Sequence, residues 1–505
     1  MAETDDALAK LLSSTVLVLV GMVVSSSAKL LERILLGRLL PPNAYGEFSI
    51  GLAIFTLGTT VGAAGYTQGI PRFMARFEDP RDVRGAWLTG LVFTVGISLA
   101  IAVALVAGAP FIVSRLFESQ TSTVLFGLFA ISIPLYVCFE VGVSAIRGQE
   151  NTTYKILTQN LCYPGLRLLL IIGFLSLGTG VVASALGYVA ALLVTIPVTY
   201  LLLSRLFPIR GDFRFHGREM TAFSAPLVVS SIMATLLTRT DTLMLGYFRP
   251  SSEVAVYNTA YPLAGVLTIV LGAIGYMYLP VASRLDGSDE DGVERIYEVT
   301  TKWIYLLVFP LFLSMLLYPS VIISTAFGPE YVAGSSALSV LAVGFFTNAA
   351  VGRNRETLSA LGETSLILVS NVVAFALNLA LNLLLIPLYG FMGAAVASAA
   401  SYLALNAVVY LFLWRRFDIT PFNRRSARAF VAIPVLLIPL GYAFRRSTSE
   451  SLTALLAFVV VFSSLTVAVA LAVRSLQAED LVVIEFIESR TSVKIPLVRD
   501  YIPEA

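Results

Sequence analysis

Ionisable side chains occur inside the long apolar stretches of this sequence, where charged residues are otherwise rare. Glu32 and Arg33 follow Lys29 by three and four residues, so a helix would carry the three groups close together on its surface. A charged group that faces lipid costs about 3 kcal/mol, and such groups therefore tend to face a wet cavity or one another. We interpret them as the main indication of function.

Comparable residues recur along the chain. Arg167 lies midway through its apolar stretch, and no acidic residue is close to it on the same predicted helix. This position favours a wall that faces an anion, and we expect Arg167→Ala to abolish function while the fold persists. The basic candidates for substrate binding are Lys29, Arg33, Arg167, Arg239, Arg353 and Arg355, and the acidic candidates for ion coupling or gating are Glu32, Asp241, Glu140 and Glu356.

The basic candidates outnumber the acidic residues on the helices that carry them. The six stand against three acidic residues, Glu32, Asp241 and Glu356, which leaves an excess of three positive charges. If these groups share one cavity, the cavity attracts anions, and the planar fork of arginine suits phosphate oxygens. The pattern therefore predicts a phosphate-bearing substrate.

A structural interpretation of the same residues stays open. Glu32 would then pair with Arg33 or Lys29, and Asp241 with Arg239, so that ion pairs hold helices together. Three amides share this ambiguity, because they could bind a sugar or pair between helices: Asn371, Asn378 and Asn382.

The elements that position these residues follow from composition. Of 505 residues, 57% are hydrophobic and 13% charged, and the mean hydropathy is +0.84. We find fourteen apolar stretches that could cross about 30 Å of hydrocarbon, and in lipid only a helix satisfies its own backbone without closing a barrel. The sequence predicts an all-α polytopic membrane protein. A single histidine, His216, argues against a histidine metal site, and no cofactor is expected.

The sequence contains an internal repeat of about six predicted helices. Leu36-Gly37 followed by Pro41 recurs as Leu245-Gly246 followed by Pro250, and Asp241 is the counterpart of Glu32 at the same offset of 209. Such repeats are typical of transporters with two pseudo-symmetric lobes. We expect an N-lobe at 1–210 with helices 1–6, a C-lobe at 211–418 with helices 7–12, extra helices 13 and 14 at 419–475, and a cytoplasmic tail at 476–505.

Basic residues in the connections predict the orientation. One side carries many of them, among them Arg72, Arg76, Arg205 and Arg210, whereas the other has four: Arg115, Arg249, Arg445 and Arg446. By the positive-inside rule both termini are cytoplasmic. The external connections are too short for a folded domain, so we expect the protein to act within the bilayer of the cell membrane.

Several segments resemble one family of membrane proteins. Residues 240–248, Thr-Asp-Thr-Leu-Met-Leu-Gly-Tyr-Phe, with 253–258, look like the seventh and eighth helices of polysaccharide and oligosaccharide-lipid flippases; 35–40, 45–48 and 147–150 fit the same family. These flippases belong to the multidrug/oligosaccharidyl-lipid/polysaccharide (MOP) superfamily. The resemblance implies two V-shaped lobes that alternate access to a cationic central cavity. The cavity would hold a phosphate or diphosphate headgroup and its sugar, while the lipid tail stays in the bilayer.

The sequence therefore predicts a flippase, not an enzyme. Its substrate would be a polyprenyl- or dolichol-phosphate-linked oligosaccharide or sugar, moved to the outer face for protein glycosylation or surface polysaccharide assembly. Besides this lipid-linked glycan, the expected partners are membrane lipids and glycosyltransferases of the same pathway, and no nucleic acid. The main alternative is a cation-coupled multidrug or toxin antiporter of the superfamily, whose cavity should be net acidic. A membrane glycosyltransferase or polymerase is less favoured. A lipid II flippase is a further alternative, although nothing in the sequence selects peptidoglycan. The glycan, carrier, pathway, energy source and oligomeric state are left open.

Overall fold

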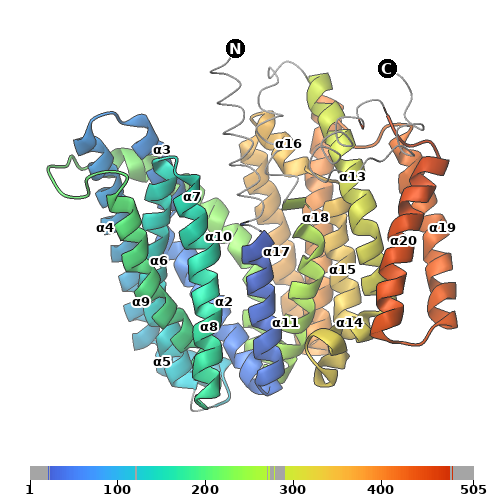
Figure 1. The fold of residues 1–505 in the computed structure, drawn as a ribbon, viewed down its shortest axis with the longest axis horizontal. Helices are drawn as coiled ribbons and strands as arrows, with labels where there is room; N and C mark the ends of the chain where they lie inside the picture. Colours follow the sequence, from blue (N-terminus) through green and yellow to red (C-terminus); the bar gives the residue numbers. More distant parts are fainter. Residues whose placement is uncertain are drawn as a thin grey trace. The chain divides into compact units, whose positions relative to one another are not determined.

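The computed structural model describes residues 21, 23–119, 122–269, 271–272, 278, 290–477 and 480. Every regular element in these ranges is helical (Figure 1). Twelve described helices are long and apolar enough to cross a membrane. Two of the fourteen expected spans, at 11–40 and 253–283, lie partly outside the described residues. An all-helical, multi-pass membrane protein is therefore confirmed.

The described chain forms two compact units, and the first consists of residues up to Thr259 together with Phe375–Ala394. Within it, α6 packs against α2, α3, α4 and α9, and α8 packs against α9. The unit contains a first helix at residues 23–39, followed by α2 (Pro42–Ala63), α3 (Tyr66–Arg76), α4 (Pro80–Ala107), α5 (Ala109–Leu116), α6 (Ser122–Gly148), α7 (Thr152–Lys155), η1 (Ile156–Cys162), α8 (Tyr163–Ser176), α9 (Val182–Ser204), α10 (Gly217–Phe248) and the start of α11 (Ser251–Gly265).

The helix that carries Arg167 contains a π-helical segment, η1. Pro164 has no N–H group and cannot donate to the carbonyl of a preceding turn. Next to it, the chain widens, and the Tyr163 N–H bonds to the Thr158 carbonyl five residues back. π-helical turns are rare and occur often at functional sites. Here the widened segment directly precedes the turn that presents Arg167.

A break separates α2 from α3. Ala64 and Gly65 both adopt left-handed backbone conformations, with φ of 45° and 72°. A Cβ atom on Gly65 would lie 2.5 Å from the carbonyl oxygen of Ser224 on α10. Glycine at 65 is therefore required both by the backbone conformation and by the close approach of another helix.

The second unit consists of Ala260–Ala374 and the described residues from Ala395 onward. Its central helix α13 packs against α15, α19 and α20. The elements are α13 (Glu290–Leu317), α14 (Pro319–Ala326), η2 (Pro329–Gly334), α15 (Ser335–Ala350), α16 (Asn354–Ala360), α19 (Ser426–Ser447) and α20 (Leu452–Ala472), with parts of α17 (Thr364–Tyr389) and α18 (Phe391–Phe417) that continue into the first unit.

The chain after α20 is tied to α13. Lys302 and Asp480 form an ion pair in which each side chain is at most 1% exposed. The Lys302 ammonium also donates to the Ser475 carbonyl at 3.2 Å, and the Trp303 indole donates to Asp480 at 2.8 Å. This network anchors Ser475 and Asp480, around the start of the predicted tail; residues 478–479 and 481–505 lie outside the described residues.

The compact units do not follow the predicted repeat boundaries at 210 and 418. The first unit takes in 211–259 because α10 packs against α2 and α3. The two-lobe division rests on sequence repetition and stays a prediction.

Candidate anion-binding cavity

Arg167 and Glu32 form a buried ion pair in the first unit. Arg167 Nε donates to Glu32 Oε2 at 2.8 Å, and a terminal guanidinium nitrogen contacts the same oxygen. The two side chains are 7% and 3% exposed. The pair joins α8 to the first helix across 135 residues of sequence. Sequence spacing predicts Arg33 or Lys29 as the structural partner of Glu32, because spacing compares only residues on one helix.

Two tyrosines hold this pair in place. The Tyr188 hydroxyl, on α9, donates to Glu32 Oε1 at 3.0 Å. The Arg167 guanidinium carbon lies 4.4 Å from the ring centre of Tyr188 and 5.0 Å from that of Tyr163. Both distances are within the range of cation–π attraction. The tyrosines therefore fix the guanidinium by contacts that do not depend on Glu32.

The pair lies in the wall of a cavity of about 220 Å³. Four basic residues line it against one acidic residue, Glu32, so its wall carries an excess of three positive charges. The lining consists of Lys29, Glu32, Arg33, Leu52, Phe55, Thr56, Thr59, Tyr136, Arg167, Tyr188 and Arg239. Four of the six basic residues predicted from the sequence, from the first helix, α8 and α10, are thus brought together. Such a wall attracts anions, and its guanidinium groups suit oxyanions with several acceptor atoms.

Glu140 on α6 lies beside this cavity but does not line it. Gln159 donates from the π-helical segment η1 to Glu140, with Nε2 to Oε1 at 3.1 Å. The Glu140 carboxylate is close enough to act electrostatically on Lys29, as are Glu32 and Arg167. Gln159 is not among the residues predicted from the sequence, and only the fold shows that it contacts Glu140.

Asp241 occupies a separate, fully buried position on α10. Its carboxylate accepts hydrogen bonds from Asn378 at 3.0 Å, Asn382 at 2.6 Å and the Tyr257 hydroxyl at 2.5 Å. The buried Asn382 Oδ1 atom has no hydrogen-bond partner among the described residues. Two of the three amides considered for sugar binding therefore serve this carboxylate. Glu32 and Asp241, counterparts in the repeat, are both held by a tyrosine and by side chains of the repeat's matching helices, α8 and α17.

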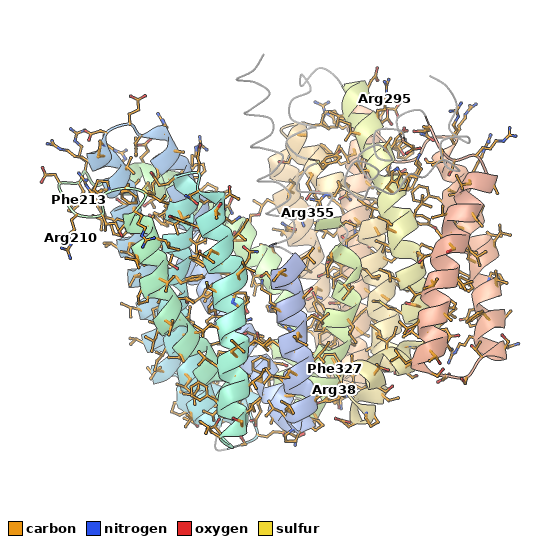
Figure 2. All side chains as sticks on the ribbon, in the orientation of Figure 1. Arg38, Arg210, Phe213, Arg295, Phe327 and Arg355 are labelled. Carbon is orange, nitrogen blue, oxygen red and sulfur yellow. The ribbon has the colours of Figure 1, made fainter. Side chains whose placement is uncertain are left out.

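Arg353, Arg355 and Glu356 belong to the second unit, around the start of α16. Arg353 donates to the Leu271 carbonyl at 3.1 Å, and its other terminal nitrogen lies 2.5 Å from Glu356 Oε1. Arg355 is partly exposed (Figure 2). Arg353 and Glu356 thus form an ion pair one helical turn apart. That these residues share a cavity with those of the first unit stays a prediction.

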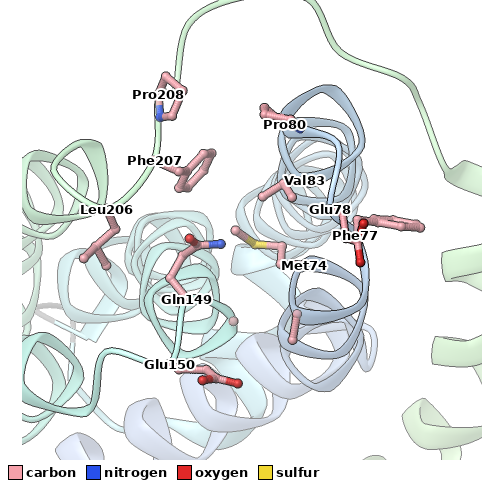
Figure 3. Close-up of a pocket in the computed structure, with 12 residues that line it drawn as sticks. Met74, Phe77, Glu78, Pro80, Val83, Gln149, Glu150, Leu206, Phe207 and Pro208 are labelled. Atoms are coloured by element: carbon pink, nitrogen blue, oxygen red, sulfur yellow. The ribbon is translucent and has the colours of Figure 1, made fainter.

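A second pocket, of about 420 Å³, opens among the ends of α3, α6 and α9 and the start of α4 (Figure 3). Its wall combines apolar side chains with two carboxylates, Glu78 and Glu150, and contains none of the predicted site residues. The apolar part includes Met74, Phe77, Val83, Leu206 and Phe207. With no basic residue in its lining, this pocket is unsuited to a phosphate.

Comparison with known proteins places the chain in a family. Residues 35–336, more than half of the sequence, match the family model described as polysaccharide biosynthesis protein. The chain belongs to this family. The membership confirms the resemblance seen in the sequence, which extended to the MOP superfamily.

Curated proteins similar to this chain include two named as flippases and one named as a multidrug resistance protein. The chain is 28% identical over 308 residues to the "Probable low-salt glycan biosynthesis flippase Agl15" of Haloferax volcanii, covering 58% of this chain and 62% of that one. It is 24% identical over 376 residues to the "Probable flippase AglR" of the same organism, covering 71% and 74%. A "Probable multidrug resistance protein NorM" of Bacillus cereus is 26% identical over 262 residues, covering 46% and 57%. The match to Agl15 thus spans less than two thirds of that protein. Two of these names are of flippases, which agrees with a transporter and not with an enzyme.

Solved structures show the same fold. The lipid II flippase MurJ, in an inward closed conformation, superposes with a TM-score of 0.70 at 12% identity, covering 88% of this chain and 97% of that one. A MOP superfamily transporter from Pyrococcus furiosus, for which reverse polarity of the binding pocket suggests a different function, gives a TM-score of 0.58 at 17% identity, covering 80% of this chain and 94% of that one. The helices therefore adopt the fold of MOP superfamily transporters.

Proposed function

We propose that this polysaccharide biosynthesis family member is a flippase for a lipid-linked glycan. Its substrate would be a polyprenyl- or dolichol-phosphate-linked oligosaccharide or sugar, carried from the cytoplasmic to the outer face of the cell membrane. The observation that carries the proposal is the cavity lined by Lys29, Arg33, Arg167 and Arg239 against the single acid Glu32. The flippase names of Agl15 and AglR support the same substrate class.

The cavity suits the charged part of such a substrate better than its glycan. Drug-sized ligands occupy pockets of about 300–1,000 Å³, and this cavity, at about 220 Å³, is smaller. A phosphate or diphosphate fits that size and the positive wall. Hydroxyl groups of Thr56, Thr59 and Tyr136 in the same lining could bind a first sugar. Recognition at the phosphate would leave the rest of the glycan and the lipid tail outside this cavity.

Transport would follow the alternating access that two six-helix lobes permit. We propose fourteen spans, with lobes at 1–210 and 211–418 and both termini cytoplasmic. A headgroup would first meet Arg353 and Arg355, pass to Arg167, and leave past Lys29, Arg33 and Arg239. Membrane lipids surround the path, and glycosyltransferases of the same pathway would supply the substrate.

For ion coupling, Asp241 is the strongest of the four acidic candidates. Its carboxylate is fully buried, and the adjacent Asn382 oxygen lacks a hydrogen-bond partner among the described residues. Oxygen atoms in this arrangement suit a proton or a hard cation.

The alternative is a cation-coupled drug antiporter, and the similarity to a NorM multidrug resistance protein supports it. A cation-binding cavity should be net negative, whereas this one is net positive. In the Pyrococcus furiosus transporter, pocket polarity is likewise the feature that suggests a different function. Charge at the cavity therefore favours the flippase.

A deletion strain tests the proposal. We expect lipid-linked glycan to accumulate on the cytoplasmic face and wild-type protein to clear it. Lys29→Gln and Arg239→Gln remove cavity charges without touching the Arg167–Glu32 pair and should lower complementation about tenfold or more. Arg115→Gln, an exposed arginine outside the cavity, is the matched control and should complement fully. Normal glycan with altered dye resistance would instead identify the antiporter.

A further inference from the structure

The anion-binding position beside Arg167 is already occupied by a group of the protein itself. The Glu32 carboxylate accepts from Arg167 Nε and a terminal guanidinium nitrogen, and the Tyr188 hydroxyl completes its hydrogen bonds. A phosphate oxygen would make the same contacts with the same donors. We propose that Glu32 is an internal competitor of the substrate, which must displace this carboxylate to reach Arg167. The inference rests on the proposed function, since it concerns the same cavity.

Arg167 keeps its place when Glu32 leaves. The Tyr163 and Tyr188 ring centres lie 5.0 and 4.4 Å from its guanidinium carbon. Tyr163 and Arg167 share α8, which packs against α9 with Tyr188. The cation and its aromatic neighbours therefore form a fixed half of the site, prepared for an anion.

Glu32, by contrast, is carried by a helix with a narrow buried face. Among residues 23–39 the buried positions are Ser25, Glu32, Leu36 and Gly37, whereas Val23, Val24, Leu31 and Leu39 are exposed. A helix held along one narrow face can shift with less loss of packing than one buried all round. Breaking the Glu32–Arg167 contact would thus loosen the first helix from α8 and α9.

The displaced carboxylate has other cations within reach. Lys29, one turn earlier on the same helix, lies within the electrostatic influence of both Glu32 and Arg167. Arg33 is adjacent in sequence and lines the same cavity. An incoming phosphate therefore pairs with Arg167 while the Glu32 carboxylate pairs with Lys29 or Arg33, and no buried charge is left unpaired. Because Glu32 moves with its helix, binding becomes coupled to movement of the first helix.

Isothermal titration of the purified full chain, with inorganic pyrophosphate and separately with farnesyl diphosphate, tests the competition. Glu32→Gln preserves the shape of the side chain but removes its charge, and we expect affinity to rise about tenfold or more, which corresponds to about 1.4 kcal/mol. Tyr188→Phe keeps the ring on Arg167 but removes the hydroxyl bond to Glu32, and it should raise affinity in the same direction by a smaller factor.

A charge control separates displacement from simple repulsion. Glu140→Gln removes a nearby negative charge that is not paired with Arg167, and the competition predicts less than about a twofold gain for it, because hydrogen bonds to charged groups exceed screened long-range effects. Equal gains for Glu140→Gln and Glu32→Gln would overturn the displacement. Glu219→Gln removes a carboxylate from an exposed ion pair outside the cavity, and its affinity should equal that of the wild type.

The outcomes also separate this inference from the proposed function. If the wild-type protein binds the probe and Glu32→Gln binds it equally or more weakly, the competition is wrong. The proposed anion-binding cavity is then still supported. Binding by neither wild type nor Glu32→Gln overturns the anion cavity itself and the competition with it. Binding that is measurable in Glu32→Gln and too weak to measure in wild type is the strongest support, since it shows a site blocked by its own carboxylate.

Discussion

Arg167 owes its position to contacts from two other helices as well as its own. Glu32 supplies the opposite charge, and the Tyr188 hydroxyl donates to Glu32. The rings of Tyr188 and Tyr163 both lie within cation–π distance of the guanidinium. Removing one member of a buried pair leaves the other charge uncompensated, which is more costly than removing both. This changes what an Arg167 substitution is expected to do.

We therefore predict that Arg167→Ala destabilises the fold by about 1–3 kcal/mol, the cost of removing one partner of a buried hydrogen-bonded pair. Lys29 and Arg33, in the same cavity wall, keep the loss below that of a wholly unpaired buried charge. The double variant Arg167→Ala/Glu32→Ala should regain a measurable part of that loss. Thermal unfolding of detergent-solubilised protein measures both. Arg115→Ala, at an exposed position, should unfold like wild type. An Arg167→Ala protein as stable as wild type would restore the expectation from sequence, that the residue is dispensable for folding.

The sequence marks the charged residues of the site but not their partners. Lys29, Arg33, Arg167 and Arg239 are conspicuous because charge is rare in apolar stretches, and all four line one cavity. The pair with Glu32 spans 135 residues, a separation that helical periodicity does not encode. The tyrosines that complete the site, Tyr163 and Tyr188, are chemically ordinary in a membrane helix, so they give no signal before the fold is known.

At the scale of elements, two departures from regular helix matter most. Hydropathy alone indicates one continuous helix across 46–70, yet the chain breaks at Ala64 and Gly65. The part before the break, α2, contributes four residues to the cavity lining, whereas α3 after it contributes none. The break therefore separates the cavity wall from the arginine-rich end of the helix, and the small residues at 64–65 are its only sequence signal.

We predict that Gly65→Ala destabilises the protein by about 1–3 kcal/mol, because a left-handed conformation is strained for alanine and its Cβ would approach the Ser224 carbonyl. Gly96→Ala is the matched control. Gly96 lies within α4, and a Cβ atom there meets no atom within 4 Å. Helix propensity favours that change by about 0.5–1 kcal/mol. The unfolding temperature should fall for Gly65→Ala and rise for Gly96→Ala. Equal shifts of the unfolding temperature would contradict a special role for the break between α2 and α3.

At the scale of the whole molecule, composition and hydropathy suffice for the all-helical membrane fold, and short motifs suffice for the family. The division into compact units was not foreseeable, because residues 375–394 join the first unit through contacts such as those of Asn378 and Asn382 with Asp241. Orientation rests on a different physical argument, the asymmetry of basic residues between the connections at the two ends of the helices.

That argument predicts the accessibility of two exposed connections. In a protein whose Cys138 and Cys162 are replaced by serine, Arg210→Cys, between α9 and α10, should react with an impermeant maleimide only after the membrane is opened. Ser449→Cys, between α19 and α20, should react in intact cells, because an odd number of predicted spans separates the two positions. Both residues are exposed, so burial does not decide the result. Labelling of position 210 from outside would reverse the orientation, and with it the direction in which Arg353 and Arg355 precede Arg167 on the path.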